Sequence, residues 1–292
     1  MRRTCRSAWR VLTHAGLVAL AALASAAADD SVPSPGASLT LRPLAEAGTY
    51  APGRVFTLAI DLAVPNGWHT YWINPGETGM APDFKWRLPP GVALAALHFP
   101  VPRRFDDGVS ISIGYEKDTR LLADFTTGPE VAGALEIGLE AVWMICRESC
   151  QPVTSQTTLA LWPEKSPAAP PVPEAAQAVA RQRLPRPGTG WTVAASRADA
   201  RLTVRITPPP TVKLPAAAWR KAWLFPLQGN AIDLAAPPVW TPVDGSWIAQ
   251  VKAGLTAPSA GAPLAFVLAF PTLPHTGWLL RSVVGQPEDF QP

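Results

Sequence analysis

Apolar and polar residues alternate most clearly over residues 135–145, where every second position is apolar. These apolar positions are Leu135, Ile137, Leu139, Ala141, Trp143 and Ile145. A period of two places their side chains on one face of a β-strand, so we expect that face to be buried. Residues 157–161 predict the return strand, and residues 55–62 predict another strand earlier in the chain.

Short strand patterns separated by proline and glycine predict an all-β fold. The chain has 34 prolines, which are confined to turns, strand starts and sheet edges in β proteins, and it has few stretches with helical periodicity. Twelve tryptophans supply bulky material for a core or a groove. We therefore predict a β-sandwich.

The strand pattern is interrupted at residues 163–190, which are rich in proline and hold one short helix-compatible run, 174–183. This composition predicts a linker. Strand patterns then resume, at residues 191–195, 201–206, 222–226, 247–251 and 264–270. We predict a first β domain over 29–162, a second and smaller β-sandwich domain over 191–285, and a loose tail over 286–292.

Residues 1–28 have the three parts of an export signal: four arginines, an apolar stretch, and small residues that allow cleavage near Ala26 or Ala28. These residues carry four positive charges and no acid, so the net charge of +3 becomes −1 without them. A nearly neutral chain with no basic run gives no support for nucleic-acid binding. No other segment approaches about 18 continuous apolar residues, so we expect an exported, periplasmic protein without stable membrane insertion.

The remaining cysteines form one close pair, Cys146 and Cys150, because Cys5 lies in the predicted signal. Four residues along an extended strand span about 13 Å, whereas a disulfide needs Cα atoms within about 7 Å. The pair therefore cannot lie on one straight strand, and a tight turn at 147–149 would bring the two sulfurs together.

Three roles are open for this pair in an oxidising compartment. A redox pair is favoured by the short loop and by its place at a strand end, because short, exposed disulfides are the labile ones. A structural disulfide is the second reading, although so small a loop contributes only about 2 kcal/mol. A Cu(I) site is the third, since the thiols could be joined by soft ligands among Met80, Met144, His69 and His98.

Several motifs in a fixed order resemble the N-terminal periplasmic domain of the thiol–disulfide interchange protein DsbD, and more closely the related suppressor of copper sensitivity protein B. The motifs are residues 67–79 (GWHTYWINPGETG), 100–102 (PVP), 114–116 (GYE) and 143–152 (WMICRESCQP). The resemblance covers about residues 40–162 and extends loosely to 190–285, where 223–226 (WLFP) fits the family's second β region.

The resemblance implies an immunoglobulin-like β-sandwich and a protein-disulfide reductase, or thiol–disulfide oxidoreductase, whose catalytic residues are Cys146 and Cys150. It implies partners of two kinds, a membrane-embedded electron donor and periplasmic thiol or disulfide proteins, and no cofactor. A cap loop at 103–108 would shield the pair, with Phe105 as its lid. Trp68 and Tyr71 would line the floor of the pocket, or would be ordinary core aromatics.

Two alternatives to a relay of electrons through the cysteine pair stay open. One is a copper-binding or copper-tolerance protein using the same thiols, and the other is a non-catalytic adaptor with a structural disulfide. This sequence ends at Pro292, about where the family's membrane segments begin, and shows no C-terminal Cys-x-x-Cys domain. The resemblance therefore implies that electrons arrive from another polypeptide, or that the direction of electron flow differs.

Overall fold

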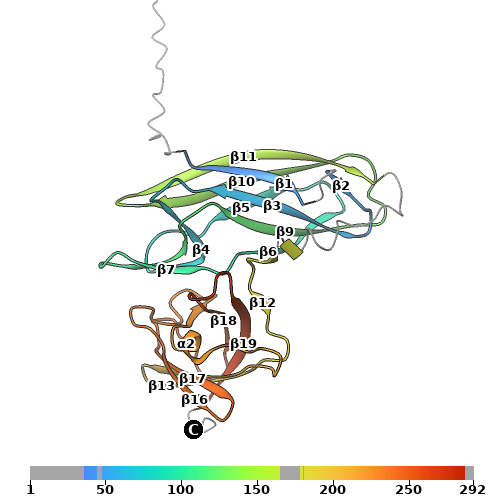
Figure 1. Ribbon diagram of the computed structural model, residues 1–292. Helices are drawn as coiled ribbons and strands as arrows, with labels where there is room; N and C mark the ends of the chain where they lie inside the picture. The colour runs from blue at the N-terminus through green and yellow to red at the C-terminus, as the bar shows by residue number, and fades with distance from the viewer. Residues whose placement is uncertain (1–35, 45–47, 165–177, 180, 287–292) are drawn as a thin grey trace, which may run out of the picture. The chain divides into compact units, whose positions relative to one another are not determined.

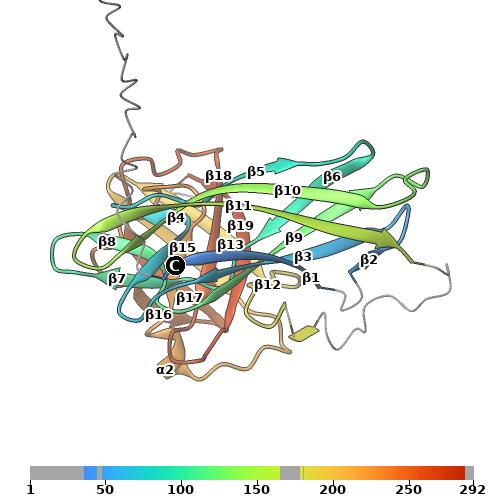
Figure 2. The same cartoon turned by 90° about the horizontal axis from the view of Figure 1, so that it is seen from above.

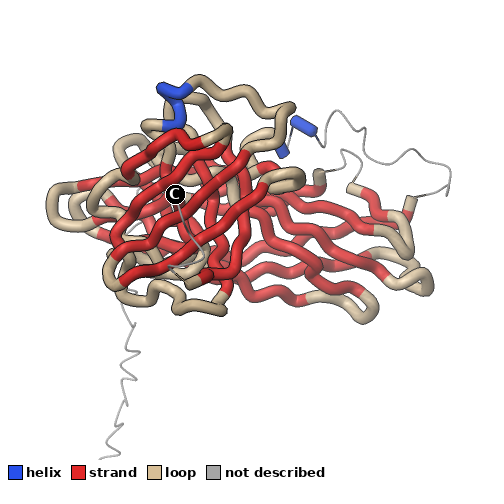
Figure 3. Tube along the Cα trace, turned by 90° about the horizontal axis from the view of Figure 1, so that it is seen from below, coloured by secondary structure: helices blue, strands red, loops and turns tan. Residues whose placement is uncertain are grey.

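A computed structural model describes residues 36–44, 48–164, 178–179 and 181–286. In this part of the chain nearly all regular structure is β-strand, and the α-helical segments are short (Figure 3). The predicted export signal, most of the predicted linker and the predicted tail after Gln286 lie outside the described residues. Where residues are described, no helix is long and apolar enough to cross a membrane.

A four-stranded antiparallel sheet forms one layer of the first β region, in the order β1-β3-β9-β6. Its strands are β1 (Ser38–Pro43), β3 (Val55–Ala63), β9 (Thr119–Thr127) and β6 (Val92–His98). β3 and β9 pair over eight residues, from Val55 opposite Thr126 to Leu62 opposite Thr119. The predicted strand at 55–62 is therefore confirmed.

A seven-stranded sheet forms the other layer, in the order β2-β11-β10-β4-β8-β7, with β5 also paired to β10. Its strands are β2 (Thr49–Tyr50), β4 (His69–Gly76), β5 (Asp83–Arg87), β7 (Arg103–Asp106), β8 (Ile111–Tyr115), β10 (Leu135–Cys146) and β11 (Cys150–Pro163). β10 and β11 run side by side as one long hairpin (Figures 1 and 2).

The core of this sandwich is built from the inward faces of the two sheets. The six alternating apolar residues of β10 are at most 3% exposed, which confirms the predicted buried face. Leu121 and Phe125 of β9, both fully buried, belong to the same cluster from the opposite sheet. Full burial of each such side chain stabilises the fold by about 1.5–3 kcal/mol.

The second β region is an eight-stranded sheet in the order β15-β18-β19-β13-β14-β17-β16, with β12 paired to β19. Its strands are β12 (Arg186–Pro187), β13 (Thr192–Ala198), β14 (Arg201–Thr207), β15 (Trp223–Pro226), β16 (Val239–Val243), β17 (Ser246–Lys252), β18 (Pro263–Ala269) and β19 (Gly277–Gly285), with the short helix α2 (Ala216–Trp219) between β14 and β15. Only two residue pairs join β13 to β19, in parallel, so the sheet consists of two halves with a narrow connection.

The all-β, immunoglobulin-like prediction is confirmed, and all five strands predicted after residue 190 are present within a few residues. Two longer strands of this region were missed. β16 contains Pro242, which weakens a strand prediction, and β19 is interrupted by Arg281 and Ser282 within an otherwise apolar run. Pairing with β17 and β18 forms these strands despite the weak local signal.

The described end of the predicted linker makes specific contacts. The Arg183 carbonyl accepts a hydrogen bond from the Val101 backbone, at 2.8 Å. Leu184 is buried against Ala59 and Leu122, and the strand β12 pairs with β19. The composition predicted a linker but not these contacts, because a proline-rich sequence does not show which surface of the fold it packs against.

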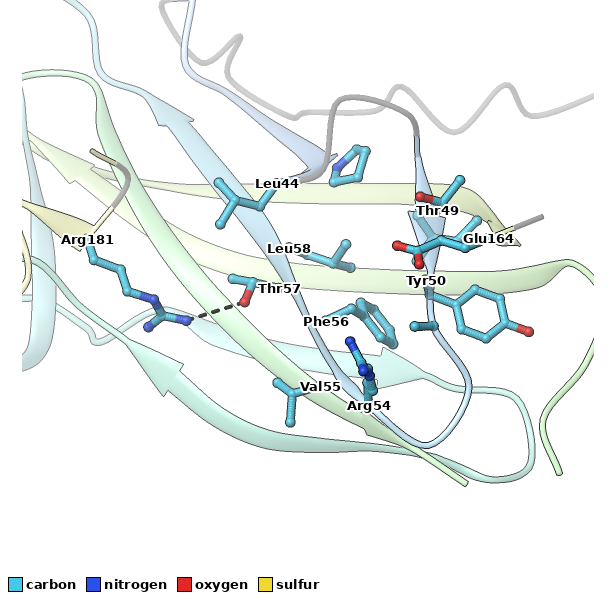
Figure 4. Close-up of a pocket in the computed structure, with 13 residues that line it drawn as sticks. Leu44, Thr49, Tyr50, Arg54, Val55, Phe56, Thr57, Leu58, Glu164 and Arg181 are labelled. Carbon is cyan, nitrogen blue, oxygen red and sulfur yellow. Dashed lines mark hydrogen bonds between the residues drawn. The ribbon is translucent and has the colours of Figure 1, made fainter. Parts of the chain in front are cut away.

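Asp124 on β9 is the centre of a polar network in the four-stranded sheet. Its carboxylate accepts hydrogen bonds from Thr57 (2.6 Å) and Arg181 (2.7 Å) and is paired with the ring of His98 (2.7 Å). Burial alone would raise the pKa of Asp124, but these three hydrogen bonds and the Arg181 charge hold it well below its usual range. The dashed line in Figure 4 marks the contact between Arg181 and Thr57.

Asp124→Asn should lower the free energy of unfolding by about 2 kcal/mol at pH 7, because three donors lose a charged acceptor. A carboxylate with a depressed pKa stabilises the fold above its unfolded pKa, near 4, and loses this effect as the pH falls. Urea unfolding should therefore show a difference between wild type and variant that shrinks below about pH 4. Asp83→Asn, at an exposed position of β5, is the control and should change little. A gap that stays constant down to pH 2.5 would contradict this account.

Candidate functional site

The cysteine pair lies at the end of the β10–β11 hairpin, where Cys146 ends one strand and Cys150 begins the next. The two residues are directly opposite in the register, their Cα atoms are 4.1 Å apart, and their sulfurs form a disulfide. Within the turn the Arg147 amide donates to the Ser149 carbonyl, at 3.2 Å. The predicted tight turn at 147–149 is confirmed.

The two sulfur-bearing residues differ sharply in exposure. Cys146 is 3% exposed, whereas Cys150 is exposed to solvent. The neighbouring strands explain the difference, because Cys146 lies between Cys150 of β11 and His69 of β4, whereas Cys150 has only β10 paired beside it among the described strands. An attacking thiolate from outside can therefore reach Cys150 more readily than Cys146.

Strand β4 holds a tyrosine against the disulfide. His69 lies opposite Cys146 in the β4–β10 pairing, and the Thr70 hydroxyl donates to the Met144 carbonyl at 2.8 Å, which fixes β4 to the end of β10. Tyr71 then donates its hydroxyl hydrogen to Cys146 Sγ at 2.7 Å, and its oxygen is 3.5 Å from Cys150 Sγ. Burial, with the negative charge of Asp107, raises the pKa of Tyr71, so the hydroxyl keeps its proton near neutral pH.

Glycine at position 79 is required by the Tyr71 ring. A Cβ atom at Gly79 would overlap that ring, and Gly79 has φ +87°, in the region that disfavours other residues. The segment after β4 therefore packs directly on Tyr71. Gly79 closes the 67–79 motif, and sequence reasoning gave it no role because a glycine's neighbours are set by the tertiary fold.

Phe105 belongs to a strand, which corrects the prediction of a surface loop at 103–108. Residues 103–106 form β7, the edge strand that pairs with β8, and 107–110 form the turn of that hairpin. The charged flanks that indicated a loop are typical of an edge strand as well. Phe105 is half-buried and stacks on His69, with ring centroids 4.9 Å apart and an interplanar angle of 17°.

The aromatic residues form a series that leads from β7 to the sulfurs. His69 stacks on Phe105 on one side and meets Tyr71 edge-on at 5.2 Å on the other. Burial lowers the pKa of His69, an effect larger than the opposing one of Asp107 and Glu116. The structure thus brings Tyr71 directly to the disulfide and places Phe105 on His69.

Trp68 lies beside the hairpin turn. It is half-buried, and the guanidinium of Arg147 stands 5.7 Å from its ring centroid. Trp68 thus packs against the hydrophobic core and meets Arg147, the residue that follows Cys146, whereas Tyr71 contacts the sulfurs themselves.

Of the two histidines weighed as copper ligands, His69 lies opposite Cys146, and His98 lies on the other sheet. His98 lies on β6 of the other sheet and is bound to Asp124, while His69 is stacked between Phe105 and Tyr71. Among the residues the structure describes, no group of three or more His, Cys, Asp or Glu is arranged to hold a metal ion. Cys146 and Cys150 are brought together as a disulfide.

Phe105→Ala should speed the reaction of the reduced cysteines with a bulky maleimide about fivefold. The variant loses a stacking interaction of about 1 kcal/mol that keeps the reagent from the cysteines. Alkylation with iodoacetamide, a smaller reagent, should change less. Val109→Ala is a control in the same hairpin because Val109 is 92% exposed. Unchanged alkylation rates together with a loss of several kcal/mol of stability would instead mark Phe105 as part of the core.

A β-sandwich that carries a half-exposed disulfide across the end of a hairpin defines, in general terms, a thiol–disulfide exchange domain. Residues 41–161 match the family described as "Thiol:disulfide interchange protein DsbD, N-terminal". The matched residues include both cysteines of the disulfide.

Solved structures support the fold over a longer range. The crystal structure of the N-terminal periplasmic domain of ScsB from Proteus mirabilis aligns with 87% of this chain and 96% of its own, at 17% identity and a TM-score of 0.57. A fragment of the major pilin GBS80 of Streptococcus agalactiae covers 85% of this chain and 91% of its own, at 8% identity, but its TM-score of 0.26 is too low to support an argument. No curated protein matches the chain.

Proposed function

We propose that this chain is an exported, periplasmic thiol–disulfide oxidoreductase that relays electrons through Cys146 and Cys150. The observation that carries the proposal is the asymmetric pair itself: an exposed sulfur at Cys150 and a buried one at Cys146 that accepts a hydrogen bond from Tyr71. A structural staple has no need of such asymmetry, whereas exchange needs one sulfur that outside groups can reach.

In the reduced protein the Cys150 thiolate attacks a disulfide of the acceptor protein. The acceptor's S–S bond breaks, one of its sulfurs leaves as a thiolate, and a mixed disulfide with Cys150 forms. The Cys146 thiolate then attacks Cys150 Sγ, the acceptor's second sulfur leaves as a thiolate, and the Cys146–Cys150 bond closes. Two electrons pass to the acceptor, whose thiolates take protons from solvent while the two cysteines have released theirs.

Reduction of this chain by a donor runs through the same steps in reverse. A donor thiolate attacks Cys150 Sγ, and the electron pair of the broken bond moves to Cys146. The Tyr71 hydroxyl supports that step because a hydrogen bond donated to a thiolate favours the charged form. We propose a membrane-embedded donor and periplasmic acceptors, and the exchange itself uses only the protein's own sulfurs, with no cofactor.

The disulfide should cycle reversibly in graded dithiothreitol or glutathione buffers, at a potential above about −300 mV, the upper limit typical of structural disulfides. The exposed Cys150 gives reductants access, and the short loop adds little chain entropy on opening. Free-thiol counting on the folded protein measures the potential. A bond that resists reduction until the protein unfolds would favour a staple. A parallel titration with Cu(I) tests the copper alternative. Tight binding of one equivalent of Cu(I), without exchange with thiol partners, would favour that alternative.

A further inference from the structure

Arg104 connects the cap strand β7 to the second β region. On β7, Arg104 and Phe105 point to opposite sides, as successive residues of a strand do. Phe105 stacks on His69 near the disulfide, while the Arg104 Nε donates to the Leu234 carbonyl at 2.8 Å. The Arg104 guanidinium also stands 5.2 Å from the ring centroid of Trp223, the first residue of β15.

The acceptor of this hydrogen bond is held in place within the second β region. Leu234 is 6% exposed, and the Asp233 side chain accepts from the Ala235 amide at 2.9 Å. Asp233 is in turn paired with Lys252 of β17, at 2.7 Å. The carbonyl that receives Arg104 is therefore fixed, and only 17% of the Arg104 side chain is exposed.

Other residues of the seven-stranded sheet also contact the second β region. Asn74 on β4, the strand that carries Tyr71, is 2% exposed and donates to the Pro226 carbonyl at 2.8 Å. Trp72 meets Phe225 edge-on at 6.5 Å. β4 also pairs with both β10 and β8, whereas β7 has backbone pairing with β8 alone among the described strands. Arg104 thus adds a contact with the second β region to a strand that is otherwise paired on one side.

We propose that the second β region holds the cap strand closed over the disulfide through Arg104. Opening β7 moves Phe105 away from His69, and the Arg104 contacts with Leu234 and Trp223 oppose that movement. Arg104 is then a positioning residue, which acts on the sulfurs through Phe105 and His69. The proposal rests on the proposed function, since it gives the second β region a role in controlling access to the same cysteine pair.

The test compares matched variants in the full chain. Arg104→Ala removes the β7 partner of the contact. Trp223→Leu removes the aromatic ring on the second β region and leaves the Leu234 carbonyl in place. Arg103→Ala is the control, because Arg103 is the neighbouring arginine, its side chain is 63% exposed, and among the described residues its ion pair is with the exposed Glu116, which follows β8. The readout is the rate at which glutathione reduces the disulfide of the folded protein.

We expect Arg104→Ala and Trp223→Leu each to raise the reduction rate about fivefold to tenfold, on the scale of a desolvated cation–π contact with a charged hydrogen bond. Arg103→Ala should stay within about twofold of wild type, as is usual for an exposed ion pair. The double variant Arg104→Ala/Trp223→Leu should be no faster than Arg104→Ala, because both changes remove the same contact. Equal rates for Arg104→Ala and Arg103→Ala, or rate increases that multiply in the double variant, would overturn the proposal.

Amide hydrogen exchange gives a readout that does not depend on redox chemistry. In Arg104→Ala the amides of β7 should exchange faster while those of β10 and β11 keep their protection, which also shows that the variant is folded. If the wild-type disulfide cannot be reduced in the folded state, the proposed function fails, yet exchange at β7 still tests the contact. If β7 keeps its full protection in Arg104→Ala, the positioning role fails whatever the disulfide does.

Discussion

Cys146→Ser should accumulate a covalent mixed disulfide with a partner protein, while Cys150→Ser should accumulate at most about a tenth as much. The reason is the difference in exposure, 3% for Cys146 against an exposed Cys150. Removing Cys146 leaves the accessible sulfur in place and takes away the thiol that would release the partner. The sequence predicts that one of the two variants traps a partner, and the exposure of Cys150 leads us to expect this of Cys146→Ser.

Non-reducing gels of both variants expressed with an intact export signal measure this result, with mass spectrometry of each shifted band. Cys146→Ser/Cys150→Ser is the control, and no reducible adduct should form with it. A stronger adduct with Cys150→Ser would reverse the order of attack. Absence of an adduct with either variant, together with binding of one Cu(I) by the native protein, would replace the relay by the copper alternative.

Gly114→Ala should lower the free energy of unfolding by about 3 kcal/mol, because its new methyl group meets only backbone. Gly114 lies on β8 opposite Tyr71 of β4. A Cβ atom there would overlap the Thr70 carbonyl oxygen and lie 2.9 Å from the Tyr71 Cα. Neither neighbour can rotate away as a side chain could, so β4 and β8 must move apart and Tyr71 must shift from the sulfurs.

Urea unfolding measures the loss of stability, and the reduction rate of the disulfide shows whether Tyr71 has moved. Gly229→Ala is the matched control: its Cβ would meet only the Asn74 Oδ1, at 3.8 Å, and its φ is not positive. We expect that control to stay within about 0.5 kcal/mol of wild type. Wild-type stability in Gly114→Ala would show that the two strands tolerate separation.

Local pattern accounts for the parts of the site that lie on one hairpin. The alternation over 135–145 determined the buried face of β10, and the cysteine spacing required a turn at 147–149, because chain geometry alone forbids a disulfide on a straight strand. The resemblance predicted a cap at 103–108, and the charged residues of that segment indicated a loop. Charge shows that a segment is near solvent and does not show whether its backbone pairs with a neighbour such as β8.

The sequence by itself determined the all-β class, the close cysteine pair and the two strands that flank it, since each depends on spacing and periodicity along the chain. Only the tertiary structure decided which sulfur is exposed, that Tyr71 contacts both sulfurs while Trp68 contacts Arg147, and that Arg104 reaches Leu234, 130 residues further along the chain. These facts depend on which strands become neighbours in a sheet. Strand neighbours are determined by backbone pairing and burial between residues far apart in the sequence, so no single stretch of sequence predicts them.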